Sequence, residues 1–283
     1  MDVTLIADSG STKTDWLLKP CHELFHTQGI NPIHQSDEQI IAVLRNELLP
    51  QLNGREPIDA VAFYGSGVRP DQEERMVRLL REALSPKSNL SSLTHHPASL
   101  RIEAHSDLFG AARALCGSSE GLACILGTGA NSCLYDGRQI VANTSPLGYI
   151  LGDEGSGAVL GKRFLNALYK GRLNGYLKVA FEDEMHTSLA DVIDRVYRSP
   201  LPNRWLASLS LFIYNHLDDS DVEALVIDNF SDFIAYNVEP YHRRDLPIQA
   251  VGSIACYYRY QLCQAAEKAG YTVGKILRSP LEG

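Results

Sequence analysis

Near its start the chain reads VTLIADSGSTKTDWLL from Val3 to Leu18, and this stretch decides the fold. Val3 to Ala7 is apolar and predicts a buried strand, and Thr14 to Leu18 predicts a second one. The polar turn from Asp8 to Lys13 joins them, so the stretch predicts a hairpin. Its tip carries a glycine and small hydroxyl residues, which let successive backbone N–H groups converge on a phosphate. The same residue types favour an ordinary polar turn, so both interpretations stay open here.

The aspartate that closes the first strand, Asp8, has the chemistry of a magnesium ligand. Mg²⁺ keeps much of its hydration shell and is commonly held, often through water, by one or two carboxylates. Two other phosphate motifs do not fit this stretch. The spacing Gly-x-x-x-x-Gly-Lys-Ser/Thr of a P-loop is absent, and no Gly-x-Gly-x-x-Gly opens a helix after the first strand. The sequence therefore argues against a P-loop protein and against a dinucleotide-binding fold of the Rossmann type.

The same local pattern returns in the middle of the chain. Leu122 to Leu126 predicts an apolar strand, Gly127-Thr128-Gly129-Ala130-Asn131 a tight turn, and Ser132 to Tyr135 a returning strand. Asp136-Gly137 then predicts the next hairpin turn. A repeated unit of strand, glycine turn and strand predicts a duplicated domain.

Strands and helices alternate through the first half of the chain. Apolar residues at helical spacing between Ile40 and Leu48 predict a helix, and Ala60 to Tyr64 predicts a strand. A second helix begins after Pro70. Leu100 to Ala104 predicts a short strand, and Asp107 then lies at or near the start of the next helix, where it is also a good N-cap residue.

The second half is dominated by a helical segment. From Gly155 to about Val238 the periodicity is helical, which predicts an all-helical insertion. Ile248 to Val251 predicts a strand that meets Gly252-Ser253. A helix is then expected from about Ile254 to Ala269, ended by the glycine that follows.

These elements together predict an α/β protein of two domains. We expect the first domain to cover residues 1–116 and the second residues 117–283, with the helical insertion at about 155–240. A chain of 283 residues is long enough to form two cores without disulfides or structural metals. Hydrophobic residues make up 45% and charged residues 21%, which is close to the average of globular domains and argues against disorder.

Composition also limits the classes of binding partner and the cellular location that we expect. The net charge is −8, so the chain has no positive field to collect the phosphates of a nucleic acid or an anionic membrane. The sequence contains no run of about 18 apolar residues, which would predict a membrane span, and we expect a cytoplasmic protein. The six cysteines show no Cys-x-x-Cys pair and no zinc spacing, so we interpret them as buried thiols. We expect a homodimer with no nucleic-acid and no membrane partner.

Two more glycine-containing segments have the chemistry of ligand sites. In Gly152-Asp153-Glu154-Gly155-Ser156-Gly157 the last three residues can bring a helix N-terminus against an anion or a sugar hydroxyl. An ordinary glycine-rich loop with Glu154 as a capping acid is the alternative. In Val251-Gly252-Ser253-Ile254-Ala255 a glycine lets a flat base approach the backbone, although Gly-Ser also suits a simple helix N-cap.

In this order the four segments resemble the ASKHA superfamily of actin, Hsp70 and sugar kinases. That resemblance implies two ribonuclease-H-like (actin-like ATPase) domains, an interdomain cleft, and phosphate-1, phosphate-2 and adenosine motifs. Leu151 to Ser156, together with Gly127-Thr128-Gly129 and Asn131, is similar to the BadF/BadG/BcrA/BcrD-type ATPase family, which includes N-acetylglucosamine kinases. The resemblance runs from Asp8 to about Gly283. It implies ATP and Mg²⁺ as cofactors and phosphorylation of an amino sugar, N-acetylglucosamine, to its 6-phosphate.

The resemblance also assigns roles to individual positions. It places the catalytic base at Asp107, which would accept the proton of the attacking sugar hydroxyl. It places the magnesium-facing aspartate at Asp8. The implied nucleotide-binding residues are Asp8, Gly10, Ser11, Thr12, Lys13, Gly127, Thr128, Gly129, Gly252 and Ser253. The implied substrate-binding residues are Asn31, Asp107, Asn131 and Asp153.

One departure from the family bears on the substrate. Animal N-acetylglucosamine kinases carry Gly-Trp-Gly ahead of the Gly-Asp-Glu-Gly-Ser loop, whereas this chain has Pro146-Leu147-Gly148-Tyr149. The aromatic platform for the sugar is therefore not matched, and the choice among amino sugars stays open.

Three other functions are alternatives to a kinase for amino sugars. The first is a BadF-like ATPase that activates a partner enzyme through a cysteine-held cluster, against which the scattered cysteines argue. The second is a non-catalytic nucleotide-dependent binding protein. The third is a ROK-type sugar kinase, whose cysteine-rich zinc motif is absent from the sequence.

Overall fold

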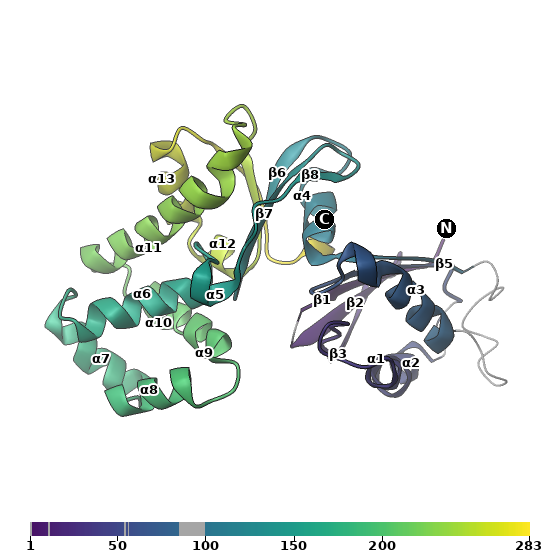
Figure 1. Ribbon diagram of the computed structural model, residues 1–283, viewed down its shortest axis with the longest axis horizontal. Helices are drawn as coiled ribbons and strands as arrows, with labels where there is room; N and C mark the ends of the chain where they lie inside the picture. The colour runs from purple at the N-terminus through teal and green to yellow at the C-terminus, as the bar shows by residue number, and fades with distance from the viewer. Residues whose placement is uncertain (1, 11, 54, 56, 85–99) are drawn as a thin grey trace. The chain divides into compact units, whose positions relative to one another are not determined.

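The structure is a computed structural model that describes residues 2–10, 12–53, 55, 57–84 and 100–283. The chain divides into two compact units, Met1–Gly110 and Ala111–Gly283. Figure 1 shows the elements of both units, coloured along the chain. Each unit is built on a five-stranded sheet with its own hydrophobic core.

The sheet of the first unit mixes antiparallel and parallel strands in the order β3-β2-β1-β4-β5. β1, β2 and β3 form an antiparallel meander, while β4 and β5 run parallel to β1. The strands are β1 (Thr4–Ser9), β2 (Lys13–Lys19), β3 (Glu23–Gln28), β4 (Ala60–Gly65) and β5 (Arg101–Ser106). The predicted first hairpin is confirmed, with strands that reach closer to its tip than the sequence indicated.

Alternation along β1 explains how this sheet packs. Leu5, Ala7 and Ser9 are buried, whereas the residues between them are half-buried on the opposite face. The buried face lies on the core of the first unit, where Trp16 and Phe63 are fully buried with ring centroids 5.8 Å apart. The position of the hairpin tip is therefore fixed by the core beneath it.

The helices of the first unit include a π-helical segment that the sequence did not predict. The predicted helix between Ile40 and Leu48 begins as α1, changes to π-helix η1 and ends as the short α2. Ser36 starts it with a capping box, in which its hydroxyl accepts from the Gln39 N–H. α1 and α3 pack against each other. The helices are α1 (Asp37–Val43), η1 (Leu44–Leu48), α2 (Leu49–Leu52) and α3 (Pro70–Leu84), and α4 (Asp107–Cys116) begins in the first unit and continues into the second.

The sheet of the second unit repeats the topology of the first. Its order is β10-β9-β6-β7-β8, in which β6, β7 and β8 form the antiparallel meander and β9 and β10 run parallel to β6. The strands are β6 (Gly121–Leu126), β7 (Ala130–Tyr135), β8 (Ile140–Ala142), β9 (Ile248–Val251) and β10 (Val273–Leu277). Strand β1 thus corresponds to β6 and β4 to β9, which confirms the predicted duplication of a ribonuclease-H-like fold.

The predicted helical insertion follows β8, drawn from teal to green in Figure 1. Its helices are α5 (Gly148–Leu151), α6 (Gly157–Tyr169), α7 (Gly175–Met185), α8 (Leu189–Tyr197), α9 (Pro202–Ser208), α10 (Ser210–Asn215) and α11 (Ser220–Phe233). The π-helix η2 (Ile234–Val238) and the 3-10 helix η3 (Glu239–Tyr241) complete it. In the described part of the chain, no helix is long and apolar enough to cross a bilayer.

Two predictions, one for a helix of the second unit and one for the six cysteines of the chain, need correction. The single helix expected from Ile254 to Ala269 is divided into α12 (Ser253–Tyr257) and α13 (Arg259–Lys268), because the fully buried Tyr258 breaks the helix and donates its hydroxyl to the Ser210 carbonyl at 2.5 Å. The six cysteines are not all buried. Cys124 and Cys133 lie in the core, whereas Cys21 and Cys263 are exposed.

Candidate functional site

The carboxyl ends of three parallel strands bring several predicted residues of the first unit to one sheet edge. Asp8 on β1 is in register with Tyr64 on β4, which is in register with His105 on β5. Residues in register on parallel strands project from the same face, about 5 Å apart from strand to strand. Asp8 and the start of α4 at Asp107 therefore lie at the same edge. Ligands of open α/β sheets bind at such carboxyl ends.

The tip of the first hairpin is held by buried hydroxyls beneath it. The Ser9 and Thr14 hydroxyls lie 2.7 Å apart, and Ser9 Oγ also donates to the Ile30 carbonyl at 3.0 Å. Above them, the Gly10 N–H donates to the Lys13 carbonyl at 3.0 Å, and both Gly10 and Thr12 are exposed. The tip is thus rigid at its base and open at its top. Ser11, which the sequence assigns to the phosphate, lies outside the described residues.

The Lys13 side chain has a partner within its own hairpin. Its ammonium lies 2.7 Å from an Asp15 carboxylate oxygen, and the other oxygen of Asp15 lies 2.6 Å from His26 Nδ1. Lys13 is 66% exposed, so the pair is screened by water and contributes little stability. Its predicted role at a phosphate stays a prediction.

Asp107 is the first residue of α4 and is not the residue that caps it. The capping bond is made by Ser106, whose hydroxyl accepts from the Phe109 N–H at 3.2 Å. The Asp107 carboxylate accepts from the Leu108 N–H at 2.8 Å through Oδ1. Burial raises the pKa of Asp107 above its ordinary value, and these backbone N–H groups oppose the shift. A half-buried carboxyl at a helix start, with an increased affinity for a proton, suits a general base.

Asn31 lies against a glycine turn to which the sequence gave no role. A Cβ atom on Gly67 would lie 2.3 Å from Asn31 Oδ1, so only glycine leaves room for the amide there. Gly67 also has a φ of 83°, which favours glycine. The amide oxygen accepts from the Ile33 N–H at 2.9 Å, which fixes its direction. This turn follows β4 just as Gly252 follows β9, and that correspondence becomes visible only once the sheets are known.

The glycine turn of the second unit is held by backbone bonds on both sides. The Gly127 N–H donates to the Gly129 carbonyl at 3.0 Å, and the Gly127 carbonyl accepts from the Gly157 N–H at 2.8 Å. The Thr128 carbonyl accepts from the Ala158 N–H at 3.2 Å. Space is open around the Gly127 Cα, and Thr128 is exposed. The start of α6 therefore braces a turn whose outer surface remains accessible.

Asp153 lies directly behind this turn. A Cβ on Gly129 would be 3.0 Å from Asp153 Oδ2, so the glycine admits the carboxylate. Asp153 is 9% exposed and has a φ of 55°, a strained conformation for a residue with a side chain. Burial raises the pKa of its carboxyl to about 6, although backbone N–H groups of Ala130 and Gly148 bind the ionised form.

Asn131 is oriented by a neighbour that the sequence did not single out. Its Oδ1 accepts from the Ser132 N–H at 2.9 Å and from Asn143 Nδ2 at 2.9 Å. Asn143 Nδ2 also donates to the Ser132 carbonyl at 2.7 Å. These bonds fix the amide of Asn131 with its oxygen inward, so its Nδ2 group is the donor offered to a ligand.

Gly252 brings the end of β9 into close contact with the end of β6. A Cβ on Gly252 would lie 2.3 Å from the Leu126 carbonyl oxygen, and its φ is 124°. Gly252 is the N-cap of α12, and Ser253 is the first residue of the helix. Gly252-Ser253 therefore does form a helix cap, the Ser253 side chain is exposed, and the predicted contact with a base stays a prediction.

A cavity of about 220 Å³ opens between this turn and the helical insertion. The predicted residues in its lining are Gly127, Thr128 and Ser253, next to Ile254. The insertion contributes four residues that the sequence did not indicate, namely Arg204, Ala207, Ser208 and Ser210. These four residues could not be predicted from the sequence, because they are far from the turn along the chain. The packing of α9 against α6 brings them to the cavity. The lining is rich in hydroxyl groups and includes one cation.

The alternative interpretation, in which Glu154 caps the helix that follows it, is wrong for α6. The cap is Ser156, whose hydroxyl accepts from the Val159 N–H at 3.1 Å. Glu154 instead accepts from Asn237 Nδ2 at 3.2 Å. Asn237 is buried in the π-helix η2, and π-helical segments frequently mark functional sites.

The described residues hold no group of three or more His, Cys, Asp or Glu side chains that could bind a metal. Burial raises the pKa of the Cys116 thiol to about 11 and that of Cys133 to about 12. Thiols of this kind are poor metal ligands and poor nucleophiles near neutral pH. Metal chemistry at the edge of the first sheet would therefore rest on Asp8, water and the oxygens of a ligand.

Two copies of a ribonuclease-H-like sheet, each with a phosphate-type turn after its first strand, define the class of actin-like ATPase folds. Solved structures agree. A candidate N-acetylglucosamine kinase from Porphyromonas gingivalis is 49% identical, with 99% of this chain and 96% of that chain covered and a TM-score of 0.88. The chain therefore belongs to the family of this Porphyromonas gingivalis protein.

More distant structures share the fold. A candidate N-acetylglucosamine kinase from Chromobacterium violaceum is 18% identical, with 97% and 95% of the chains covered and a TM-score of 0.67. The ethanolamine utilization protein EutJ from Carboxydothermus hydrogenoformans is 15% identical, with 99% and 85% covered and a TM-score of 0.52. No protein-family model and no curated protein sequence matches the chain.

Proposed function

We propose that this protein is an ATP-dependent sugar kinase that phosphorylates an amino sugar, N-acetylglucosamine, on its 6-hydroxyl. The observation that carries the proposal is the 49% identity, over 99% of the chain, to the candidate N-acetylglucosamine kinase of Porphyromonas gingivalis. The motif Leu151 to Ser156 with Gly127-Thr128-Gly129 supports a place in the BadF-type branch of the superfamily.

In this proposal Asp107 is the general base. The sugar hydroxyl oxygen attacks the γ-phosphorus of ATP, the bond to the β-phosphate oxygen breaks, ADP leaves, and the hydroxyl proton passes to Asp107. The raised pKa of Asp107 supports this role, because a base with a greater proton affinity takes up the proton more readily. Ser106 makes the capping bond of α4, so the Asp107 carboxylate is not needed as the cap and is held by the Leu108 N–H.

The second unit offers a hairpin turn and a cavity that suit a nucleotide. Thr128 in that turn is exposed and has a hydroxyl that suits a phosphate, and in the first unit Thr12 at the hairpin tip is exposed as well. The cavity beside Ser253 has the polar lining expected for a ribose or base, and Arg204 adds a cation that can attract phosphate or stack on a base.

Magnesium fits the residues of the first sheet edge. Asp8 lies at the end of β1, opposite Asp15 on β2, and the described residues form no group of three or more side chains that could hold a metal. That donor set suits an ion that keeps most of its waters and binds phosphate oxygens. When bound, Mg²⁺ would neutralise charge on the transferred phosphate.

The sugar would be bound by polar groups of fixed direction. The Asn131 Nδ2 group is a donor, and the ionised Asp153 carboxylate is an acceptor for sugar hydroxyls. Asn31 is held against Gly67 and is a further candidate. Next to Asp153, Leu147 is 63% exposed where animal enzymes carry the tryptophan, so this chain would offer an aliphatic surface to the sugar.

The alternative of an activating ATPase has no observation in its favour among the described residues. Cys124 and Cys133 lie in the core, and burial raises the pKa of both thiols. The homodimer and the cytoplasmic location stay predictions.

The test is a coupled ADP-release assay with Mg-ATP and a panel of N-acetylglucosamine, glucosamine, glucose, N-acetylmannosamine and no sugar. The proposal expects a rate with N-acetylglucosamine at least 100-fold above the sugar-free rate, since phosphoryl transfer must be directed to the sugar and away from water (~10² or more). A rate independent of sugar would make the protein an ATPase and would refute the proposal.

A further inference from the structure

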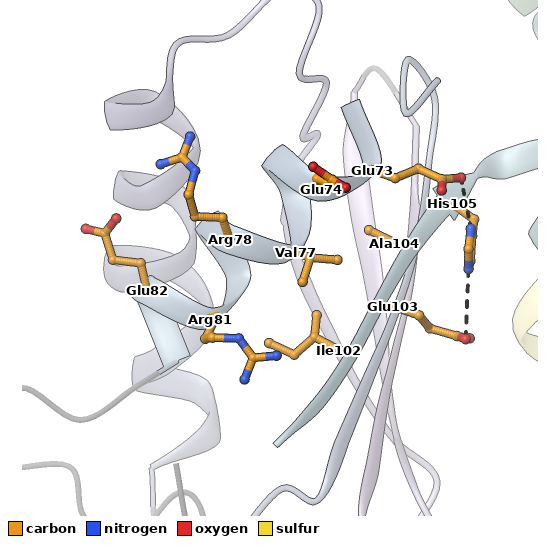
Figure 2. Close-up of a pocket in the computed structure, with 10 residues that line it drawn as sticks. All are labelled: Glu73, Glu74, Val77, Arg78, Arg81, Glu82, Ile102, Glu103, Ala104 and His105. Atoms are coloured by element: carbon orange, nitrogen blue, oxygen red, sulfur yellow. Dashed lines mark hydrogen bonds and ion pairs between the residues drawn. The ribbon is translucent and has the colours of Figure 1, made fainter. Parts of the chain in front are cut away.

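His105 lies between two glutamates that come from different elements. Its Nδ1 is 2.9 Å from Glu73 Oε1 on α3, and its Nε2 is 3.9 Å from Glu103 Oε2 on β5. Figure 2 shows both interactions, with the imidazole between the two carboxylates. Glu103 in turn accepts a hydrogen bond from the Tyr64 hydroxyl at 2.9 Å. His105 is 28% exposed, so these contacts are partly shielded from water.

The same imidazole packs against the first turn of α4. The rings of His105 and Phe109 have centroids 4.8 Å apart, and the His105 and Tyr64 rings are stacked at 6.4 Å. Gly110 packs closely against the Tyr64 ring, because a Cβ on that glycine would lie 2.6 Å from Tyr64 Cγ. Two successive residues of α4 therefore rest on a layer formed by His105 and Tyr64.

Asp107 lies between these supports in the chain. It follows the last residue of β5, Ser106, and precedes Phe109 by two positions. Its backbone position is set by Ser106 on one side and by the ring contact of Phe109 on the other. Since a displacement of about 1 Å in a catalytic group can cost on the order of 10²-fold in rate, the rigidity of this turn matters for catalysis.

We infer that His105 is a positioning residue for Asp107. The contacts with Glu73 and Glu103 fix the imidazole, the imidazole fixes Phe109, and Phe109 fixes the first turn of α4 with the carboxylate that it carries. The inference rests on the proposed function, in which Asp107 is the general base. His105 itself is not assigned any contact with substrate.

The cavity beside this cluster does not change the inference. About 680 Å³ is open between α3 and β5, but several of its charged lining residues already have partners within the unit. Arg78 pairs with Asp37 at 2.7 Å, and Arg81 donates to the Leu100 carbonyl at 3.1 Å. The cluster is therefore structural support for α4, and it is not proposed as a ligand site.

The first test is the kinetics of His105→Ala. We expect kcat to fall about 10- to 100-fold while KM for ATP and for the sugar changes less than about twofold, because a misplaced base affects the transition state and not ground-state binding. His105→Gln, which can still donate to Glu73, should recover part of the lost kcat. Unchanged kcat, or a rise in KM alone, would overturn the inference.

His216 supplies a matched control. It too stacks on a phenylalanine, Phe212, at 4.2 Å, and lies 3.7 Å from a glutamate, Glu184, but it belongs to the helical insertion. His216→Ala should leave kcat within about twofold of wild type. If His105→Ala does not fold, Glu73→Gln on the surface of α3 replaces it, and an unchanged kcat in that variant also overturns the inference.

A double-mutant cycle separates this inference from the proposed function. If His105 acts through Asp107, adding His105→Ala to Asp107→Asn should lower kcat by less than about twofold further, because the residue that it positions is already inactive. An additional loss as large as in wild type would overturn the positioning role. If Asp107→Asn alone leaves kcat unchanged, the proposed base is wrong and the proposed function fails first.

Discussion

Asp107 and Asp153 are carboxylates that burial makes harder to ionise, and each is held by backbone N–H groups beside a glycine turn or a helix start. The two shifts have the same cause but imply different roles. Asp107 would take up a proton during the reaction, whereas Asp153 would bind sugar hydroxyls only when it is ionised. The chemistry at the scale of single residues therefore predicts a pH dependence that belongs to Asp153.

Sugar binding should strengthen as the pH rises through about 6. With a pKa of about 6, Asp153 is roughly one-tenth ionised at pH 5 and almost fully ionised at pH 7.5. We expect KM for the sugar to fall by up to about tenfold over this range while KM for ATP changes little. Steady-state kinetics between pH 5 and 8 measure this, and Asp153→Asn should remove the inflection. An inflection that survives in the variant would assign it to another group.

The same shift has a consequence for stability, with a definite sign. The folded protein raises the pKa of Asp153 from 3.8 to about 6, so the neutral carboxyl is the form that folding favours. Its contribution is fully present below pH 3.8 and is lost as the pH rises through about 6. The melting temperature of wild type minus that of Asp153→Asn should therefore be lower at pH 7.5 than at pH 5. A difference that does not change with pH would contradict the shift.

At the scale of elements, the turns after β1 and β6 are matched by turns after β4 and β9. Ser66 donates its N–H to the Ser9 carbonyl at 2.8 Å, and Gly252 lies against the Leu126 carbonyl. In each unit the end of the first strand is thus supported by the turn that follows its parallel neighbour. The turn after β9, at Gly252-Ser253, also lines the cavity assigned to the nucleotide.

Gly252→Ala should disturb this turn and weaken ATP binding. The added methyl would lie 2.3 Å from a backbone oxygen, and the φ of 124° is unfavourable for alanine, so we expect a loss of about 2–3 kcal/mol in the free energy of unfolding. KM for ATP should rise about tenfold or more. Gly171→Ala is the control, since Gly171 also has a positive φ, 66°, but open space around it. Equal effects of the two substitutions would show that backbone strain alone is responsible.

Filling the cavity beside the helical insertion should block the nucleotide selectively. Ser208 is exposed at the cavity wall, so Ser208→Trp would occupy much of about 220 Å³ without disturbing the core. We expect KM for ATP to rise at least tenfold and the affinity for sugar, measured by calorimetry, to stay within about twofold. Ser199→Trp changes another exposed serine of the insertion that does not line the cavity and should have no effect. Normal ATP kinetics in Ser208→Trp would place the nucleotide elsewhere.

At the scale of the whole molecule, the duplication was readable from the sequence because both halves begin with a hairpin whose tip carries glycine. Several elements were not readable. β8 has only three residues, none of them buried, and β3 buries two of its six residues, so neither strand has a strong apolar pattern. The π-helical segments η1 and η2 leave the apolar spacing nearly unchanged, so their sequence resembles that of an ordinary helix.

The site could be predicted only as far as its local motifs reach. The turns around Gly10, Gly127 and Gly252 carry composition that indicates phosphate or base contacts. The contributions of Arg204 and Asn143 depend on long-range packing, which leaves no local pattern in the sequence. The sequence gives no signal for the role of His105 either, because its partner Glu73 lies on α3 and is brought to β5 only by the fold.

The central claim, that phosphate passes from ATP to an amino sugar, is tested most directly by identifying the product. Wild-type protein is incubated with Mg-ATP and carbon-13-labelled N-acetylglucosamine, and phosphorus and carbon NMR spectra are recorded. The account predicts a phosphomonoester at carbon 6, formed in equal amount to ADP, and none with Asp107→Asn over the same time. Release of inorganic phosphate in place of the ester would contradict it.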